Sequence, residues 1–252
     1  PLLLSYLGDE KYGLWATLLS IINWISYFDV GIGNGLRNLL SKEITYEKYE
    51  EANRSVSTAY VVLTCIASVV YIALVLSVVL FNWNGILSTS LDIKPVLFIT
   101  FTFICLNFVL ALSNILLYAL QQSEKIAIRG CAVQILNLIG LLIIRTISDS
   151  SLVAIALLFG CTTMIVYVFN SIQIFREKNF LKPSFKLFDS KKIREICNVG
   201  IKFFIIQVCC LLLFTVDNLL ITHYFGPETV TPFSITNKVF HTAYTVLAAF
   251  LV

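Results

Sequence analysis

The sequence predicts an all-α protein, a polytopic bundle of transmembrane helices, and three observations lead to this fold class. Of the 252 residues, 58% are hydrophobic and only 13% are charged, whereas a soluble domain averages about a quarter charged residues. Apolar runs recur along the whole chain, and several reach the roughly 20 residues that a helix needs to cross a bilayer. None alternates as barrel strands do, and helices satisfy their own backbone hydrogen bonds in lipid.

The apolar runs predict about seven membrane-crossing helices. They lie near residues 12–36, 57–81, 95–121, 127–147, 151–175, 198–222 and 230–252. The chain starts at Pro1 inside one apolar run and stops at Val252 inside another. We therefore expect a fragment of a longer, transporter-sized protein.

Basic residues concentrate in alternate connections, and this bias predicts the orientation. The connections 37–56, 122–130 and 175–197 are basic, whereas 82–95, 148–150 and 223–229 carry only Lys94 among them. We expect the basic connections in the cytoplasm and the segment before Tyr12 outside. The formal charge of +3 does not indicate a nucleic-acid partner, because the basic residues lie in these loops.

The longest basic connection predicts a domain boundary. We expect a first transmembrane lobe at 1–175, a cytoplasmic linker at 176–196 and the start of a second lobe at 197–252. Within the linker, residues 188–196 predict a short amphipathic helix on the membrane face, held by anionic lipid or bound by a partner. Residues 6–10 and 224–228 share Tyr, Gly and Glu at one offset, which favours a parallel repeat of the lobes.

The first segment carries a polar stripe. On a helical wheel drawn through 20–41, one face within about 60° holds Ser20, Asn23, Tyr27, Asn34, Asn38 and Ser41, with Arg37 beside it. Such a stripe needs another helix or a water-filled cavity as its partner. Gly31 and Gly35 form a GxxxG pair that indicates close helix packing or, alternatively, a bend. We expect Asp29 either to pair with a cation on a neighbouring helix or to face the cavity.

Further polar seams run along other segments. One seam repeats every seven residues in segment 95–121 and consists of Thr100, Asn107, Asn114 and Gln121, with Tyr118 beside it. Segment 127–147 carries Gly130, Gln134, Asn137 and Arg145, and segment 151–175 carries Thr163, Tyr167, Asn170 and Gln173. Segment 198–222 carries Gln207, Thr215, Asn218 and Thr222, with Asp217 beside them. Hydrogen bonds between such side chains join membrane helices at about 0.6–2 kcal/mol each. Several seams in one bundle predict a hydrated cavity instead, with Asn107 and Asn114 near its centre.

Charges inside membrane segments mark functional sites by default. Asp217 and Lys238 lie deep enough to be candidates, while Arg145 either snorkels or binds ligand and Arg37 either binds ligand or sets topology. His241 is expected to be a neutral hydrogen-bonding group. The predicted substrate-binding residues are Asn23, Tyr27, Asn34, Arg37, Asn38, Asn107, Asn114, Gln121, Gln134, Arg145, Gln207, Asp217, Asn218 and Lys238.

Nothing in the sequence predicts an enzyme. There is no phosphate-binding loop, no HExxH and no Ser/His/Asp grouping. The seven cysteines form no CxxC pair and are interpreted as small buried hydrophobes. We expect no catalytic residue, cofactor or metal.

Two stretches carry a family resemblance, Tyr6-Leu-Gly-Asp-Glu-Lys-Tyr-Gly-Leu-Trp15 and Phe28-Asp-Val-Gly-Ile-Gly-Asn-Gly-Leu-Arg-Asn38. They resemble the polysaccharide and O-antigen flippases of the multidrug/oligosaccharidyl-lipid/polysaccharide exporter superfamily, and residues 217–226 resemble the end of that family's seventh helix. The resemblance implies two lobes, about twelve to fourteen helices in all, around a central cavity with alternating access. The helices here would be the second to the eighth, and most of the second lobe would be absent.

The resemblance also implies a function, in the bacterial cytoplasmic (inner) membrane. The implied substrate is a lipid-linked oligosaccharide on undecaprenyl diphosphate, moved across the membrane for O-antigen, capsule or exopolysaccharide synthesis. Amides would bind the glycan and a few cations the diphosphate, while the tail stays in membrane lipid. A polysaccharide polymerase and a chain-length regulator are the protein partners it implies, and no nucleic acid. The alternatives are a cation-coupled multidrug antiporter, which needs an acidic cavity, and a non-transporting scaffold of a polysaccharide-assembly complex.

Overall fold

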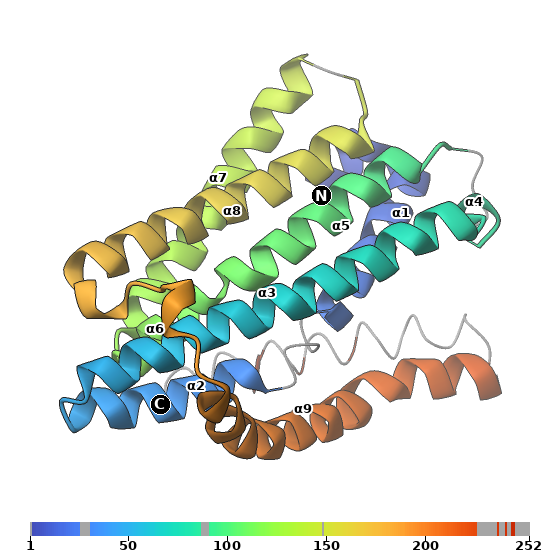
Figure 1. Ribbon diagram of the computed structural model, residues 1–252. Coiled ribbons are helices and arrows are strands. Elements are labelled where there is room, and N and C mark those ends of the chain that lie inside the picture. The colour runs from blue at the N-terminus through green and yellow to red at the C-terminus, as the bar shows by residue number, and fades with distance from the viewer. Residues whose placement is uncertain are drawn as a thin grey trace. The chain divides into compact units, whose positions relative to one another are not determined.

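A computed structural model shows that the chain is helical, and the residues it describes contain no strand (Figure 1). It describes residues 2–25, 31–86, 91–147 and 149–225, with 236, 240, 243 and 244; the side chains at 9, 10, 16, 17, 20–25, 86 and 210–225 are not described. The chain divides into two compact units, Pro1–Phe203 and Phe204–Val252. The prediction of an all-α membrane protein is confirmed.

The first unit contains the helices that shape the candidate site. In order, the elements are α1 (Leu2–Ile25), α2 (Ile32–Thr45), α3 (Tyr49–Leu80), α4 (Trp83–Ile86), α5 (Lys94–Leu110), α6 (Leu112–Ala119), α7 (Ser123–Ile147) and α8 (Leu152–Glu177), then short 3-10 turns at Asn179–Leu181 and Phe185–Leu187, and α9 (Ser190–Phe225). α9 begins in the first unit and continues into the second. α3, α5 and α8 run side by side, and α7 packs against α8 (Figure 1).

Four stretches of the described residues are long and apolar enough to cross a membrane. They are α3, the combined span of α5 and α6 (Lys94–Ala119), α7 and α8, with mean hydropathies between 2.0 and 2.7. They confirm the predicted segments 57–81, 95–121, 127–147 and 151–175. The segment predicted at 198–222 falls within α9, and most of the one at 230–252 lies outside the described residues.

The prediction of one continuous helix over residues 12–36 is wrong. Gly31 has φ +75° and ψ 7°, a left-handed conformation, and α2 begins at the next residue. Glycine tolerates this conformation because it has no Cβ, so the sequence places a helix start where hydropathy alone indicated continuity. A helical wheel cannot be drawn through Gly31, and the stripe predicted from Ser20 to Ser41 therefore does not exist as one face of a helix.

The connection predicted at 37–56 is also largely helical. α2 extends to Thr45 and α3 starts at Tyr49, which leaves a turn of three residues. Glu47 takes a left-handed φ of 57° in this turn, and the amide of Lys48 donates to the carbonyl of Glu43 at 2.9 Å. Glu50 and Glu51 occupy the first turn of α3, where carboxylates favour the positive end of the helix dipole.

Residues 188–196 do not form a separate amphipathic helix. Ser190 starts α9, and the Asp189 carboxylate accepts a hydrogen bond from the amide of Lys191 at 2.9 Å. The preceding linker lies against α3, where the amide of Ser184 donates to Ser57 Oγ at 3.0 Å and the amide of Asp189 donates to Thr58 Oγ1 at 3.1 Å. Protein contacts therefore hold this segment.

The apolar core of the first unit has two clusters. One joins α1, α5, the start of α8 and the end of α3 around Trp15, Leu97, Phe101 and Ile155. The other joins α2, α6, the start of α3 and the end of α8, and includes Ile196 of α9. Outside these clusters many apolar side chains of α3, α7 and α8 are exposed, as expected of lipid-facing surface.

Two connections predicted to share the outer side of the membrane meet in the structure. Lys11 Nζ donates to the carbonyl of Ser150 at 2.6 Å, and Ser150 Oγ donates to the carbonyl of Leu7 at 3.1 Å. The beginning of the chain and the connection between α7 and α8 therefore lie at the same end of the bundle. Which end faces the cytoplasm stays a prediction from the basic residues.

Candidate functional site

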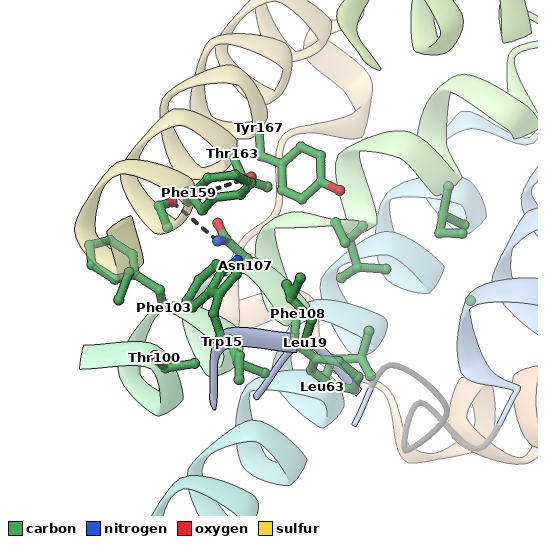
Figure 2. Close-up of a pocket in the computed structure, with 17 residues that line it drawn as sticks. Trp15, Leu19, Leu63, Thr100, Phe103, Asn107, Phe108, Phe159, Thr163 and Tyr167 are labelled. Carbon is green, nitrogen blue, oxygen red and sulfur yellow. Dashed lines mark hydrogen bonds between the residues drawn. The ribbon is translucent and has the colours of Figure 1, made fainter. Parts of the chain in front are cut away.

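A cavity of about 360 Å³ lies inside the first unit and is lined by residues of both core clusters. α5 and α8 supply most of its walls, and α1, α2, α3 and α6 complete the lining. Five of the lining residues are aromatic, namely Trp15, Phe103, Phe108, Phe159 and Tyr167 (Figure 2). Trp15 meets the ring of Phe159 edge to face, with centroids 5.4 Å apart.

Asn107 is the central polar group of this cavity. It projects from α5 toward α8, and its Nδ2 donates to the carbonyl of Gly160 at 3.3 Å (Figure 2). Gly160 lets Phe103 of α5 pack closely against α8, because a Cβ there would overlap the ring of Phe103. Asn107 Oδ1 is buried and has no hydrogen-bond partner among the described residues, so the amide has an unused acceptor.

Two more buried polar atoms at the cavity lack partners within the described part of the chain. They are Trp15 Nε1 and Thr100 Oγ1, on side chains that are 2% and 3% exposed. An unsatisfied buried polar group costs about 1–3 kcal/mol. One donor, one hydroxyl and one amide oxygen are therefore unpaired on residues that line the cavity.

The remaining polar lining comes from α8. Thr163 Oγ1 donates to the carbonyl of Phe159 at 2.9 Å, and Tyr167 lies one turn further along the same face (Figure 2). No described residue of the lining is charged. The cavity thus offers neutral hydrogen-bonding groups between aromatic faces and no counter-charge for an ion.

Three other seam residues, Asn114, Asn137 and Asn170, join helices. Asn170, which is fully buried, donates to Ser113 Oγ and to Asn114 Oδ1, each at 3.1 Å. Thr162 Oγ1 donates to Asn137 Oδ1 at 2.5 Å. Asn107 and Asn114 therefore share one seam and both bond to α8, but Asn107 also lines the cavity, whereas Asn114 does not.

The structure disperses the remaining predicted site residues that it describes. Asn38 Nδ2 donates to the backbone carbonyl of its neighbour Asn34 at 3.0 Å, and the Arg37 guanidinium lies over the Tyr118 ring, 4.9 Å from its centroid. Three more are exposed side chains, namely Gln121, Gln134 and Arg145. Gln207 belongs to the second unit.

Five predicted residues lie outside the described side chains, namely Asn23, Tyr27, Asp217, Asn218 and Lys238. Asp29 and His241 lie there as well. Their roles stay predictions.

Sequence reasoning missed the aromatic lining. Phe103 and Asn107 are four residues apart on α5, and Phe159, Thr163 and Tyr167 are spaced by four on α8. That spacing places each set on one helical face. A search for aromatic side chains beside polar ones at this spacing could have found the site, whereas a search for polar seams alone found only Asn107, Thr100, Thr163 and Tyr167.

Together, four helices long and apolar enough to cross a membrane and the neutral, aromatic-lined cavity define a multi-pass membrane protein with a binding-sized cavity in its first unit. Residues 1–252 match the model of a protein family that is described as "Polysaccharide biosynthesis protein". The chain belongs to this family, which confirms the resemblance noted from its sequence.

One curated relative adds a narrower likeness. A putative O-antigen transporter of Salmonella typhimurium (strain LT2) is 41% identical over 51 residues, which is 19% of this chain and 12% of the relative. The match thus spans about an eighth of that transporter's length. No solved structure matches the chain.

Proposed function

We propose that this chain is part of a flippase that moves an undecaprenyl-diphosphate-linked oligosaccharide across the bacterial cytoplasmic membrane for surface polysaccharide synthesis. The observation that carries the proposal is the match to the polysaccharide biosynthesis family along all 252 residues. The likeness to a putative O-antigen transporter and the four membrane-crossing helices support it.

The cavity supports a role in binding the glycan. Sugar rings present hydroxyl groups at their edges and C–H groups on their faces, so they suit amides and hydroxyls placed beside aromatic rings. Asn107, Thr100 and Trp15 supply such groups. The volume of about 360 Å³ is near the lower end of the roughly 300–1,000 Å³ typical of small-molecule sites, which suits part of an oligosaccharide.

The diphosphate requires cations, and the described cavity lining has none. We place the diphosphate outside this cavity, with Arg37 as its candidate ligand in the first unit. Lys238 stays a separate prediction from the sequence. The polyprenyl tail would stay in membrane lipid. A polymerase and a chain-length regulator remain the expected protein partners, because a polymerase would consume the flipped product.

The rival functions suit the cavity less well. A drug-cation antiporter needs an acidic group at its binding site, and the described lining offers no carboxylate. A scaffold needs only packed seams, whereas the first unit also contains a cavity.

Complementation tests the proposal. The intact protein is expressed in bacterial strains that each lack the flippase for a different glycan, and surface polysaccharide is measured by gel and antiserum. Restoration in at least one strain is expected. Failure in every strain, with the protein present in the inner-membrane fraction, would contradict the function.

A further inference from the structure

Lys192, in the first turn of α9, is buried among three carboxylates. It is 5% exposed, and its Nζ lies 2.8 Å from Glu43 Oε1, 2.5 Å from Glu51 Oε2 and 3.1 Å from Glu195 Oε2. Glu43 comes from the last turns of α2 and Glu51 from the first turn of α3. One ammonium group therefore ties the start of α9 to both helices of the α2–α3 hairpin.

The environment keeps this lysine charged. Burial opposes the charge, but the hydrogen bonds that Lys192 donates to Glu43, Glu51 and Glu195 outweigh it and raise the pKa of Lys192 above the usual lysine value. Glu43 is also 5% exposed, and its Oε1 accepts a further hydrogen bond from Ser55 Oγ at 2.9 Å. Removing one member of such a buried pair leaves an uncompensated charge, whereas replacing both can be nearly neutral.

Glycines bring the same face of α9 against α2. Lys192, Ile196 and Gly200 are spaced by four residues and so share one face. A Cβ at Gly200 would lie 2.6 Å from the carbonyl oxygen of Gly31, and a Cβ at Gly35 would overlap the carbonyl of Ile196. The two backbones therefore touch just beyond the ionic cluster.

The linker before α9 is fixed to α3 as well. Ser57 and Thr58 accept hydrogen bonds from the amides of Ser184 and Asp189, and Leu181 is fully buried in the core cluster around α2 and α6. The connection and the first turns of α9 thus have three kinds of attachment to one hairpin, namely ionic, backbone-to-backbone and hydroxyl-to-amide.

We propose that Lys192 is a buried ionic clamp that makes residues 178–203 a fixed part of the first lobe. The linker is then no flexible tether held by lipid, and the part of α9 up to Phe203 has a register set by α2 and α3. The proposal concerns how this segment is held and does not depend on the transported substrate.

Hydrogen exchange of the intact protein in lipid nanodiscs tests the clamp. In Lys192→Met, amides of the peptides covering 184–200 should exchange about tenfold faster or more, because an unpaired Glu43 charge opens the attachment. Peptides from α5 and α7 should not change. Lys191→Met is the matched control: it removes the same charge from an exposed neighbour and should leave exchange unaltered.

Two further variants extend the test, and Glu51→Gln, compared with wild type, keeps it decisive if Lys192→Met folds poorly. Glu51→Gln removes a half-exposed partner and should accelerate exchange over 184–200 by a smaller factor than Lys192→Met. The double variant Glu43→Leu/Lys192→Met should exchange more slowly than Lys192→Met, because no unpaired buried charge remains. The clamp is overturned if Lys192→Met and Glu51→Gln exchange like wild type, if Lys191→Met matches Lys192→Met, or if the double variant is no slower than Lys192→Met.

Discussion

Asn107 and Asn114 illustrate at the scale of single residues how one sequence pattern covers two physical roles. Both belong to the seam with seven-residue spacing, yet Asn107 lines the cavity and Asn114 accepts a hydrogen bond from Asn170 of α8. Periodicity shows which residues share a face, but it cannot show whether an amide meets another amide or an open space. That distinction depends on the side chains of α8, which are distant in sequence.

Thiol accessibility separates these two roles. In a variant without native cysteines, Asn107→Cys should react with a small water-soluble thiol reagent, because it faces the cavity. Asn114→Cys should react at least about tenfold more slowly, since its position is packed against α8. Labelling is measured by gel shift in membranes. Equal rates at both positions, or an inert Asn107→Cys, would contradict the cavity assignment.

Asn170 should matter for stability, because it is fully buried and donates to two side chains. Asn170→Leu should lower the free energy of unfolding by about 1–2 kcal/mol, measured as a lower Tm in detergent. The control is Gln134→Leu on α7, an exposed amide that should change Tm little. A Tm for Asn170→Leu equal to that of wild type would remove its role in joining α5–α6 to α8.

At the scale of elements, hydropathy predicted the α3, α5–α6, α7 and α8 spans and failed at α2. The long apolar helices are recognisable because lipid demands uniformly apolar side chains. α2 carries Arg37, Lys42 and Glu43, so its composition suggested a loop, while its real start depends on the backbone angle of Gly31. The burial of Glu43 was equally unpredictable, since its partner Lys192 lies 149 residues away.

Glycine contacts between α2 and α9 give a prediction at this scale. Gly35→Ala should destabilise the first unit by about 1–3 kcal/mol, because the added methyl group overlaps the backbone of Ile196. Gly130→Ala is the matched control, since nothing lies within 4 Å of its added Cβ, and alanine suits a helix better than glycine. Thermal unfolding compares the two. If Gly35→Ala is as stable as Gly130→Ala, then the close approach of α2 and α9 is wrong.

At the scale of the whole molecule, the sequence led to the right class and family through composition and two motifs. The candidate site was only partly predictable, because a neutral aromatic cavity forms where α1, α5 and α8 meet and no single segment carries its signature. The predicted lobes at 1–175 and 197–252, with a linker at 176–196, remain a prediction, and the Lys192 clamp would extend the first lobe into α9.

Transport in a defined membrane tests the central claim most directly. The intact protein is reconstituted in liposomes with a lipid-linked oligosaccharide that it serves in cells, and the fraction of glycan open to a membrane-impermeant reagent is followed over time. We expect protein-dependent translocation, about tenfold slower in Asn107→Leu, the change that one lost hydrogen bond of about 1.4 kcal/mol produces. Translocation no faster than in protein-free liposomes would contradict the proposed function, and an unchanged rate in Asn107→Leu would contradict the role of the cavity.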